Sequence, residues 1–315
     1  MATVTFAERR RLRTTKSSGG LTVGRPSFLW SLPGITYFAL FAILPLGVVL
    51  WLSFQSWNGV NRLHSVGTAN WSQVFADPVF LQSFRITGIL VVLGVVTQTP
   101  VAMLLGVWAA GHQRNRAVLT ALYFIPLLMS AAAIAIVWNA LLYPYAGLPA
   151  EFPGFFGAGW FNNGFWRSNP ATAIGVITFV GMWQWTPFHT LLYQGGARAI
   201  PEVLYQAAAI DGCGRIRMFF HITLPQLRNT MITSIVLMVV GGLTTFDTIL
   251  ILTQGQPGTS TTNTSYYMYE KGFQSFQFGQ ASVAGVVLAV VATVISLILV
   301  RASGWDKMRS TQEGM

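Results

Sequence analysis

The stretch QAAAIDGCGRIRMFFHITLP (residues 206–225) lies between two long apolar runs, yet it carries an aspartate, two arginines and a histidine. Just upstream, Pro201 and Glu202 predict the start of a helix, because proline suits the first helical position and an acidic side chain favours the first turn. Asp211 and Gly212 predict its end, since glycine accepts the positive φ that stops a helix. A folded, partly polar segment therefore separates two apolar runs.

A second short helix is predicted after this turn. Apolar residues recur there at helical spacing and would share one face, namely Ile216, Phe219, Phe220 and Leu224. We expect Pro225 to end this helix and to begin the next apolar run. Residues 199–225 thus predict a helix-turn-helix hairpin at a membrane surface. From periodicity alone, an interfacial hairpin without any partner is an open alternative.

Composition indicates the class of protein. Of the 315 residues, 53% are hydrophobic and 9% are charged, and the mean hydropathy is +0.54. Soluble domains have roughly 25% charged residues. Several apolar runs exceed the ~20 residues that a helix needs to cross a bilayer. The sequence therefore predicts an all-α polytopic membrane protein with about six spans, at residues 28–54, 84–110, 117–142, 171–192, 230–252 and 281–300.

The basic residues predict the orientation of these spans. The net charge is +10, but the basic residues lie at the ends of spans and form no nucleic-acid motif, so we expect no nucleic acid as a partner. Fifteen Lys and Arg residues fall on the side of both termini and the hairpin, and four fall on the other side. Because positive loops stay inside, both termini and the hairpin are predicted to be cytoplasmic. The expected organisation is a tail at 1–27, a transmembrane domain at 28–305 and a second tail at 306–315.

The hairpin is similar to the EAA loop of binding-protein-dependent ABC transporter permeases. The family pattern is E-A-A, two residues, D-G-A, and an apolar stretch that ends I-x-L-P. This chain has Q-A-A at 206–208, D-G-C at 211–213 and I-T-L-P at 222–225. The resemblance implies the type I ABC importer permease fold, and it assigns coupling to the ATPase to Gln206, Ala207, Ala208, Asp211, Gly212 and Pro225. Two positions depart from the pattern, because Gln206 replaces glutamate and Cys213 replaces alanine.

Other segments resemble the carbohydrate-importing branch of the same family. FDTILILTQGQP (residues 246–257) is similar to F-D-x-I-x-x-L-T-x-G-G-P, with Gln256 in place of one glycine. WRSNPATAI, MWQWTPF and YPYAGLP also look like segments of that branch. The F-D…L-T pattern is typical of the first permease subunit of a heterodimer. The resemblance implies a carbohydrate substrate, a second permease subunit, two ATP-binding subunits and an extracytoplasmic solute-binding protein, in the inner membrane of a prokaryote.

The sequence predicts that ATP is hydrolysed elsewhere. No lysine lies in the pattern G-x-x-x-x-G-K-[ST], so this chain cannot cradle phosphate by that motif. The sequence contains no arrangement of a nucleophile with a base, and no pair of carboxylates, that would indicate an enzyme. None of the four histidines has a second ligand at the spacing of a metal site. We expect no cofactor or metal on this chain, and the resemblance implies that a separate subunit uses ATP. The implied mechanism is alternating access, with the hairpin transmitting motion from the ATPase.

A substrate pathway is predicted within the spans. Asp247 is the only carboxylate inside a predicted span, and an ionisable residue there is a functional candidate because its burial is costly. A position near the outer end of the span, open to water, is the alternative. Sugar-contacting positions of the family's maltose transporter add Gln184, Trp185, Phe188, Thr244 and Thr245. An aromatic ring beside amides and hydroxyls suits a sugar, but two further contact positions are apolar here, at Leu127 and Ala131, so maltose is not the expected substrate.

A secondary transporter or channel driven by an ion gradient is the competing hypothesis. Such proteins often carry several intramembrane ionisable groups and an inverted repeat. This chain has one such aspartate and no clear repeat. The sequence therefore favours the permease.

Overall fold

The computed structural model describes residues 28–111, 118, 121–156 and 165–302. The two expected tails, at 1–27 and 306–315, lie outside the described residues. Residues up to Gly47 and residues from Val48 onward belong to two separate units.

The first unit is a series of apolar helical turns. It contains η1 (Phe28–Trp30), α2 (Leu32–Phe38), the π-helical turn η2 (Ala39–Ile43) and the first part of α3 (Leu44–Leu52). Residues Leu32–Leu52 are long and apolar enough to cross a membrane. This agrees with the first predicted span.

The second unit begins with the remainder of α3, which is followed by a small antiparallel sheet in which β1 (Gln55–Ser56) pairs with β2 (His64–Ser65). Its other elements are helical. Their bounds are α4 (Ala69–Ala76), α5 (Pro78–Ala109), α7 (Ile125–Leu128), α8 (Ala131–Leu141), α9 (Leu148–Glu151), α10 (Pro153–Phe156), η4 (Trp166–Ser168), α11 (Pro170–Arg198), α12 (Glu202–Ile210), α13 (Arg215–Met218), η5 (Phe219–Thr223), α14 (Leu224–Gln226), α15 (Arg228–Leu243), α16 (Asp247–Leu252), α17 (Thr264–Tyr269), η6 (Glu270–Gln274) and α18 (Phe278–Ala302).

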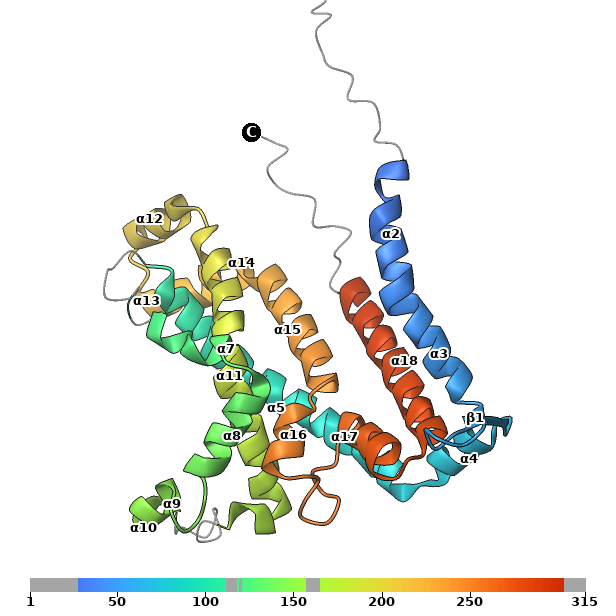
Figure 1. Ribbon diagram of the computed structural model, residues 1–315. Helices are drawn as coiled ribbons and strands as arrows, with labels where there is room; N and C mark the ends of the chain where they lie inside the picture. Colours follow the sequence, from blue (N-terminus) through green and yellow to red (C-terminus); the bar gives the residue numbers. More distant parts are fainter. Residues whose placement is uncertain (1–27, 112–117, 119–120, 157–164, 303–315) are drawn as a thin grey trace, which may run out of the picture. The chain divides into compact units, whose positions relative to one another are not determined.

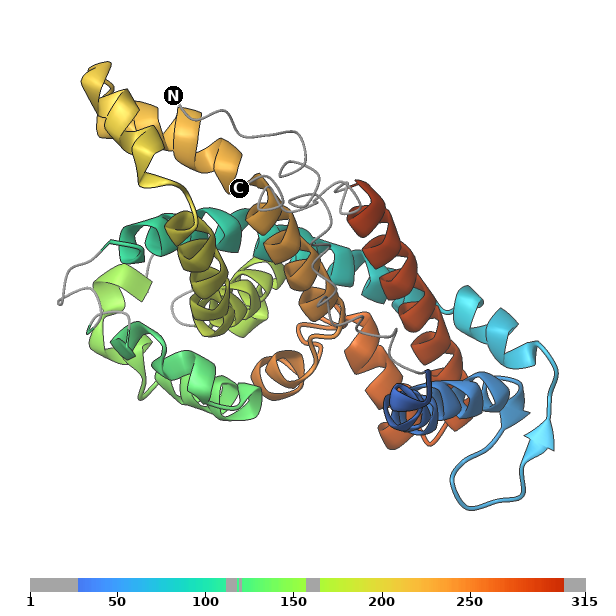
Figure 2. The ribbon, with the colours of Figure 1, turned by 90° about the horizontal axis from the view of Figure 1, so that it is seen from above.

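Helices α5 and α11 form the centre of this unit and pack along each other (Figure 1). A Cβ atom on Gly106 of α5 would lie 2.6 Å from the Cβ of Tyr193 on α11. Glycine at this position therefore permits the close approach of the two backbones, as small residues do in membrane bundles. Viewed from above, α11 lies between α5 and α8 (Figure 2).

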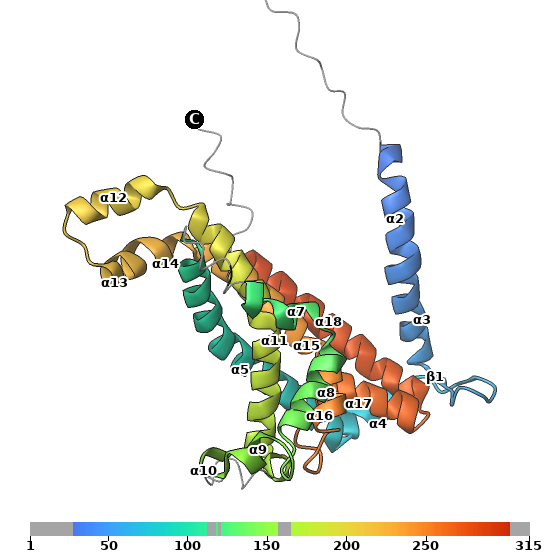
Figure 3. The ribbon, with the colours of Figure 1, turned by 60° about the vertical axis from the view of Figure 1, so that its left-hand side comes forward.

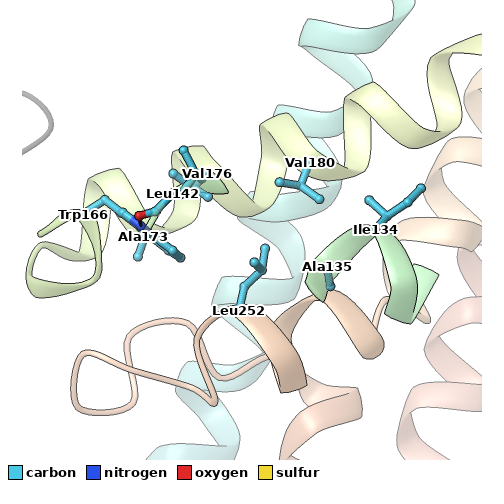
Figure 4. Packing of buried hydrophobic residues seen from close by; sticks show 8 residues of the cluster. All are labelled: Ile134, Ala135, Leu142, Trp166, Ala173, Val176, Val180 and Leu252. Carbon is cyan, nitrogen blue, oxygen red and sulfur yellow. Dashed lines mark hydrogen bonds between the residues drawn. The ribbon is translucent and has the colours of Figure 1, made fainter. Parts of the chain in front are cut away.

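A buried apolar cluster joins α8, α11 and α16 (Figure 4). Trp166, which precedes α11, is 2% exposed and its indole Nε1 donates a hydrogen bond to the carbonyl of Leu142 at 3.1 Å. The other members are Ile134, Ala135, Ala173, Val176, Val180 and Leu252. This cluster fixes α16 against α11, although the two helices are far apart in sequence.

Two predicted spans are interrupted in the structure. The span expected at 117–142 breaks at Met129 and Ser130, where α7 ends and α8 begins. The span expected at 230–252 breaks at Thr244, Thr245 and Phe246, between α15 and α16. Broken helices are tolerated at membrane depth where neighbours satisfy the freed backbone groups or the break lines a cavity.

Among the described residues, three helices are long and apolar enough to span a membrane, or four if the bent pair α13–α14 and α15 counts as one span. The helix α11 has 29 residues but is less apolar, because several of its buried positions are polar. The helix α17 and its continuation η6 were not predicted from the sequence.

Candidate functional site

A cavity of about 470 Å³ lies among α5, α8, α11, α15 and the start of α16. A volume of this size is typical of small-ligand pockets. The six residues that the sequence assigned to a substrate pathway all line it, namely Gln184, Trp185, Phe188, Thr244, Thr245 and Asp247. The structure thus brings the predicted residues together, and their role in transport stays a prediction.

The break between α15 and α16 forms one wall of the cavity. The hydroxyls of Thr244 and Thr245 donate to the carbonyl of Gly241 at 3.1 and 3.2 Å. Asp247 is exposed and begins α16, where the partial positive charge of a helix N-terminus favours an acidic side chain. The wall therefore presents hydroxyls and one carboxylate.

Two buried side chains hold this break from outside the cavity. The side-chain amide of Asn263 donates to the carbonyl of Thr245, and the hydroxyl of Ser265 donates to the carbonyl of Leu243 at 3.2 Å. Asn263 is fully buried and also accepts a hydrogen bond from the backbone N–H of Tyr266 at 2.9 Å, which caps α17. Carbonyls freed by the break are thereby satisfied from α17, as the membrane interior requires.

The face of α11 supplies the opposite wall. Gln184 is 3% exposed and its amide donates to the carbonyl of Met129 at 3.4 Å, where the chain breaks between α7 and α8. Trp185 is half exposed, and Phe188 lies one turn further along the same face. An aromatic and polar surface of this kind can contact both the apolar faces and the hydroxyl rim of a sugar.

Sequence reasoning missed two polar residues of this cavity. Gln98 from α5 and His189 from α11 both line it, and both are more than nine-tenths buried. The sequence interpretation considered the histidine only as a metal ligand, found no second ligand for it, and did not single out the glutamine. A polar residue in the middle of the predicted span at 84–110 was the signal that could have drawn attention to Gln98.

The cavity carries little charge. Among the described residues that line it, Asp247 is the one carboxylate and there is no lysine or arginine. Its polar atoms otherwise come from amides, hydroxyls and an imidazole. These neutral groups form hydrogen bonds with hydroxyls as donors or acceptors.

The segment after α11 forms a hairpin. Figure 3 shows α12 running out from the end of α11 and α13 and α14 running back. The turn between them is a Schellman motif, in which the N–H of Gly212 donates to the carbonyl of Ala209 at 3.1 Å and the N–H of Cys213 donates to the carbonyl of Ala208 at 2.9 Å. Gly212 has φ +73°. The predicted turn is therefore confirmed, because Gly212 adopts the positive φ that ends the first helix.

The hairpin also corrects one expectation. Pro225 does not end the second helix, because η5 and α14 continue to Gln226 and the chain bends by 67° only before α15. The π-helical turn η5 precedes the proline, and a local widening of this kind accommodates a residue that has no N–H to donate. Near the base of the hairpin, the hydroxyls of Tyr205 and Thr223 are 2.9 Å apart and hydrogen-bonded.

The predicted coupling residues have different exposures. Ala208 is buried, and the others are exposed, namely Gln206, Ala207, Asp211, Gly212 and Pro225. The hairpin also exposes large apolar side chains, namely Val203, Ile210, Ile216 and Phe220. An exposed apolar patch of this kind is typical of an interaction surface.

A charged cluster lies at the start of α5, the end of this helix remote from the hairpin. Lys271 Nζ is 3.0 Å from Asp77 Oδ2, and the hydroxyl of Tyr267 donates to the same oxygen at 2.9 Å. Burial alone would raise the pKa of the Asp77 carboxyl, but hydrogen bonds from Lys271, Tyr267 and the N–H of Val79 outweigh it and lower that pKa below 3.8. The cluster ties the start of α5 to α17 and η6.

Comparison with known proteins identifies the family. Residues 102–304 match the family model described as binding-protein-dependent transport system inner membrane component. The chain is 31% identical to the permease protein of the trehalose/maltose transport system of Thermococcus litoralis, over 86% of this chain and 92% of that protein. It is 28% identical to the permease protein of the diacetylchitobiose uptake system of Streptomyces coelicolor, over 89% of this chain and 83% of that protein.

The fold also resembles a solved structure. A chain of a bacterial ABC transporter involved in the import of the acidic polysaccharide alginate has a TM-score of 0.76 and 23% identity, and the match covers 90% of this chain and 96% of that chain. This likeness is evidence for the fold. Since the family model spans most of the chain, this protein belongs to the inner membrane components of binding-protein-dependent transport systems, the permease subunits of ABC importers.

Proposed function

We propose that this chain is the first permease subunit of an ABC importer that moves an uncharged sugar or oligosaccharide across the cytoplasmic membrane. The chemistry of the cavity carries the proposal, because Trp185 and Phe188 lie beside amides and hydroxyls along one lined space. Sugars have apolar C–H faces and a hydroxyl rim that match such a surface. Relatives named for trehalose and maltose and for diacetylchitobiose support the same substrate class.

The charge of the side chains that line the cavity favours neutral carbohydrates over anionic ones as substrates. Some similar proteins are named for anionic substrates, such as the sn-glycerol-3-phosphate transport system permease of Salmonella choleraesuis, which is 27% identical over 87% of this chain and 92% of that protein. Anionic ligands are usually held by arginine or lysine. The described lining of this cavity has neither, and the carboxylate of Asp247 would repel an anion.

The hairpin is the proposed contact with the ATP-binding subunits. Val203, Ile210, Ile216 and Phe220 offer exposed apolar surface, and the stiff Schellman turn fixes the two arms relative to each other. Closure of two ATP-binding subunits would move the hairpin and switch the cavity between outward and inward openings. Gln206 can accept or donate a hydrogen bond there but cannot form the ion pair of the family glutamate.

The rest of the assembly follows from the same reasoning. We infer that a second permease subunit completes the transmembrane cavity and that an extracytoplasmic binding protein delivers the sugar. This chain itself binds no cofactor and catalyses no reaction, since ATP is hydrolysed on the separate subunits. The excess of Lys and Arg in the tails and the hairpin supports the proposal that both termini and the hairpin are cytoplasmic and that residues 28–305 form the membrane domain.

Reconstitution of the whole importer tests this function. The complex with its partner permease, ATP-binding subunits and binding protein is placed in liposomes, and uptake of labelled trehalose, maltose, diacetylchitobiose and sn-glycerol 3-phosphate is measured with and without ATP. We expect ATP-dependent uptake of at least one of the neutral sugars and none of the phosphate ester. Uptake of a solute by this chain alone, driven by an ion gradient, would establish the secondary transporter instead.

A further inference from the structure

We propose that Gln98 and His189 form a second polar subsite in the cavity, which binds hydroxyl groups of a neutral carbohydrate at the end nearer the hairpin. This inference rests on the proposed function, since it assigns part of the same cavity to the same substrate class. Gln98 comes from α5 and His189 from α11, and both line the cavity.

Packing places these two residues within about one helical turn of each other. Leu90 of α5 shares a buried cluster with Ile177 of α11, and Ala102 of α5 shares another with Tyr193 of α11. The two helices therefore run in the same direction, and the close approach of Gly106 to Tyr193 sets a register in which Gln98 is level with residues 184–185, one turn before His189. Ile249, close to the break between α15 and α16, belongs to the first of these clusters.

The subsite is thus separate from the wall formed by the break. Leu90 marks the level of the break and Gln98 is eight residues further along α5, which corresponds to about 12 Å at 1.5 Å per residue. That spacing separates different rings of an oligosaccharide rather than two hydroxyls of one ring. The half-exposed Trp185 belongs to the part of α11 that is level with Gln98.

Among the described residues, the side-chain amide of Gln98 has a free donor that a ligand in the cavity could occupy. It is 6% exposed, and its Nε2 makes no hydrogen bond within the part of the chain that the structure describes. Buried amide groups in proteins are nearly always hydrogen-bonded. Trp138, Thr190 and Tyr193 also have buried polar atoms that meet no partner at full hydrogen-bond geometry among the described residues, but they do not line the cavity. The amide of Gln98 is therefore the one of these groups that a ligand in the cavity can reach.

A hydrogen bond to α15 fixes the imidazole ring of His189. It is 4% exposed, and its Nδ1 is 2.9 Å from the hydroxyl of Ser234 on α15. A partner on one ring nitrogen fixes the orientation of an imidazole and leaves the other nitrogen for a ligand. An amide and an imidazole together offer donors and acceptors without net charge. Hydroxyl groups, which both donate and accept, fit this pair better than phosphate or carboxylate groups.

Equilibrium binding tests the subsite directly. Labelled trehalose, maltose and diacetylchitobiose are titrated onto the complete complex in nanodiscs, with the ATP-binding subunits held by a non-hydrolysable ATP analogue. Gln98→Leu and His189→Leu should each weaken binding of the transported sugar about tenfold, which is the usual effect of losing one buried hydrogen bond. His189→Gln, which keeps a donor and an acceptor, should restore most of the affinity.

Thr97→Val is the matched control. Thr97 is the neighbour of Gln98 on α5, but it is exposed and its hydroxyl bonds back to the carbonyl of Leu93 at 2.7 Å. We expect wild-type binding from this variant, and all variants should co-purify with the ATP-binding subunits. Unchanged affinity in both leucine variants overturns the subsite, and so does an equal loss in the Thr97 control. A wild-type complex that takes up none of the three sugars refutes the proposed function instead.

Discussion

Substitution of Gly212 by valine should uncouple transport while leaving the membrane domain intact. A Cβ at this position meets no atom within 4 Å, so the substitution causes no steric clash with neighbouring residues. The cost comes from the backbone, because φ is +73° and a β-branched residue is strained there. Such strain costs about 1–3 kcal/mol, and the Schellman hydrogen bonds of Gly212 and Cys213 depend on this conformation.

That free energy lowers the fraction of molecules in which the turn has its native conformation. A cost of 1–3 kcal/mol lowers the population of the native hairpin about 5- to 150-fold relative to other turn conformations. The spans do not share this strain, so the amount of protein in the membrane should stay near wild type. Sugar uptake and stimulated ATP hydrolysis should fall to a small fraction of wild type, either because the ATPase is released or because it no longer drives the spans.

Gly212→Asn is the control for this experiment. Asparagine is the next best residue after glycine in the left-handed region at a helix C-terminus, so this variant should keep most of its transport. The measurements are the ATPase that co-purifies with each variant, its stimulated hydrolysis, and uptake into liposomes. Normal uptake by Gly212→Val would refute the reasoning and leave the segment as an interfacial helix pair.

Four further outcomes are expected. Thr244→Val combined with Trp185→Ala should reduce uptake without loss of assembly, and wild-type uptake kinetics would remove both residues from the pathway. Gln206→Glu should be tolerated and should increase the ATPase that co-purifies, because a carboxylate can form an ion pair; loss of the ATPase would contradict this. Cys213 should react with an impermeant thiol reagent from the cytosolic side only, and labelling of intact cells from outside would reverse the orientation. Asp77→Asn should lower stability in detergent by about 1 kcal/mol in thermal melts at pH 7. The pKa of the Asp77 carboxyl is lowered in the folded state. Its contribution to stability is therefore present above the unfolded pKa and is lost as the pH falls through the folded pKa. If the stability difference between wild type and Asp77→Asn were equally large below the folded pKa, the role of the ionised carboxyl would be contradicted.

The hairpin could be predicted because its determinants are local. Pro201 and Glu202 predict the start of the first helix, and Asp211 and Gly212 predict the turn that ends it. The structure places a Schellman motif at that turn. Apolar length likewise predicted the positions of α5, α11 and α18, although α5 begins earlier, at Pro78.

The break within the fifth span could not be predicted in this way. Residues 230–252 read as one apolar run with no proline, and the groups that stabilise the break, Asn263 and Ser265, come from α17. A hydrogen bond between segments about twenty residues apart leaves no periodic signal in the sequence. Gln98 and His189 were missed for a related reason, because only the fold shows that both line one cavity.

The support of this break from α17 has a consequence for engineering. A mutant library intended to change which sugar is carried can be restricted to Thr244, Thr245 and Asp247, whose side chains line the cavity. Asn263 and Ser265 should be kept constant in such a library, because they fix the course of the main chain through its carbonyl oxygens whatever side chains that segment displays. Shape and selectivity are thereby assigned to different residues, and selectivity can be redesigned without redesigning the scaffold.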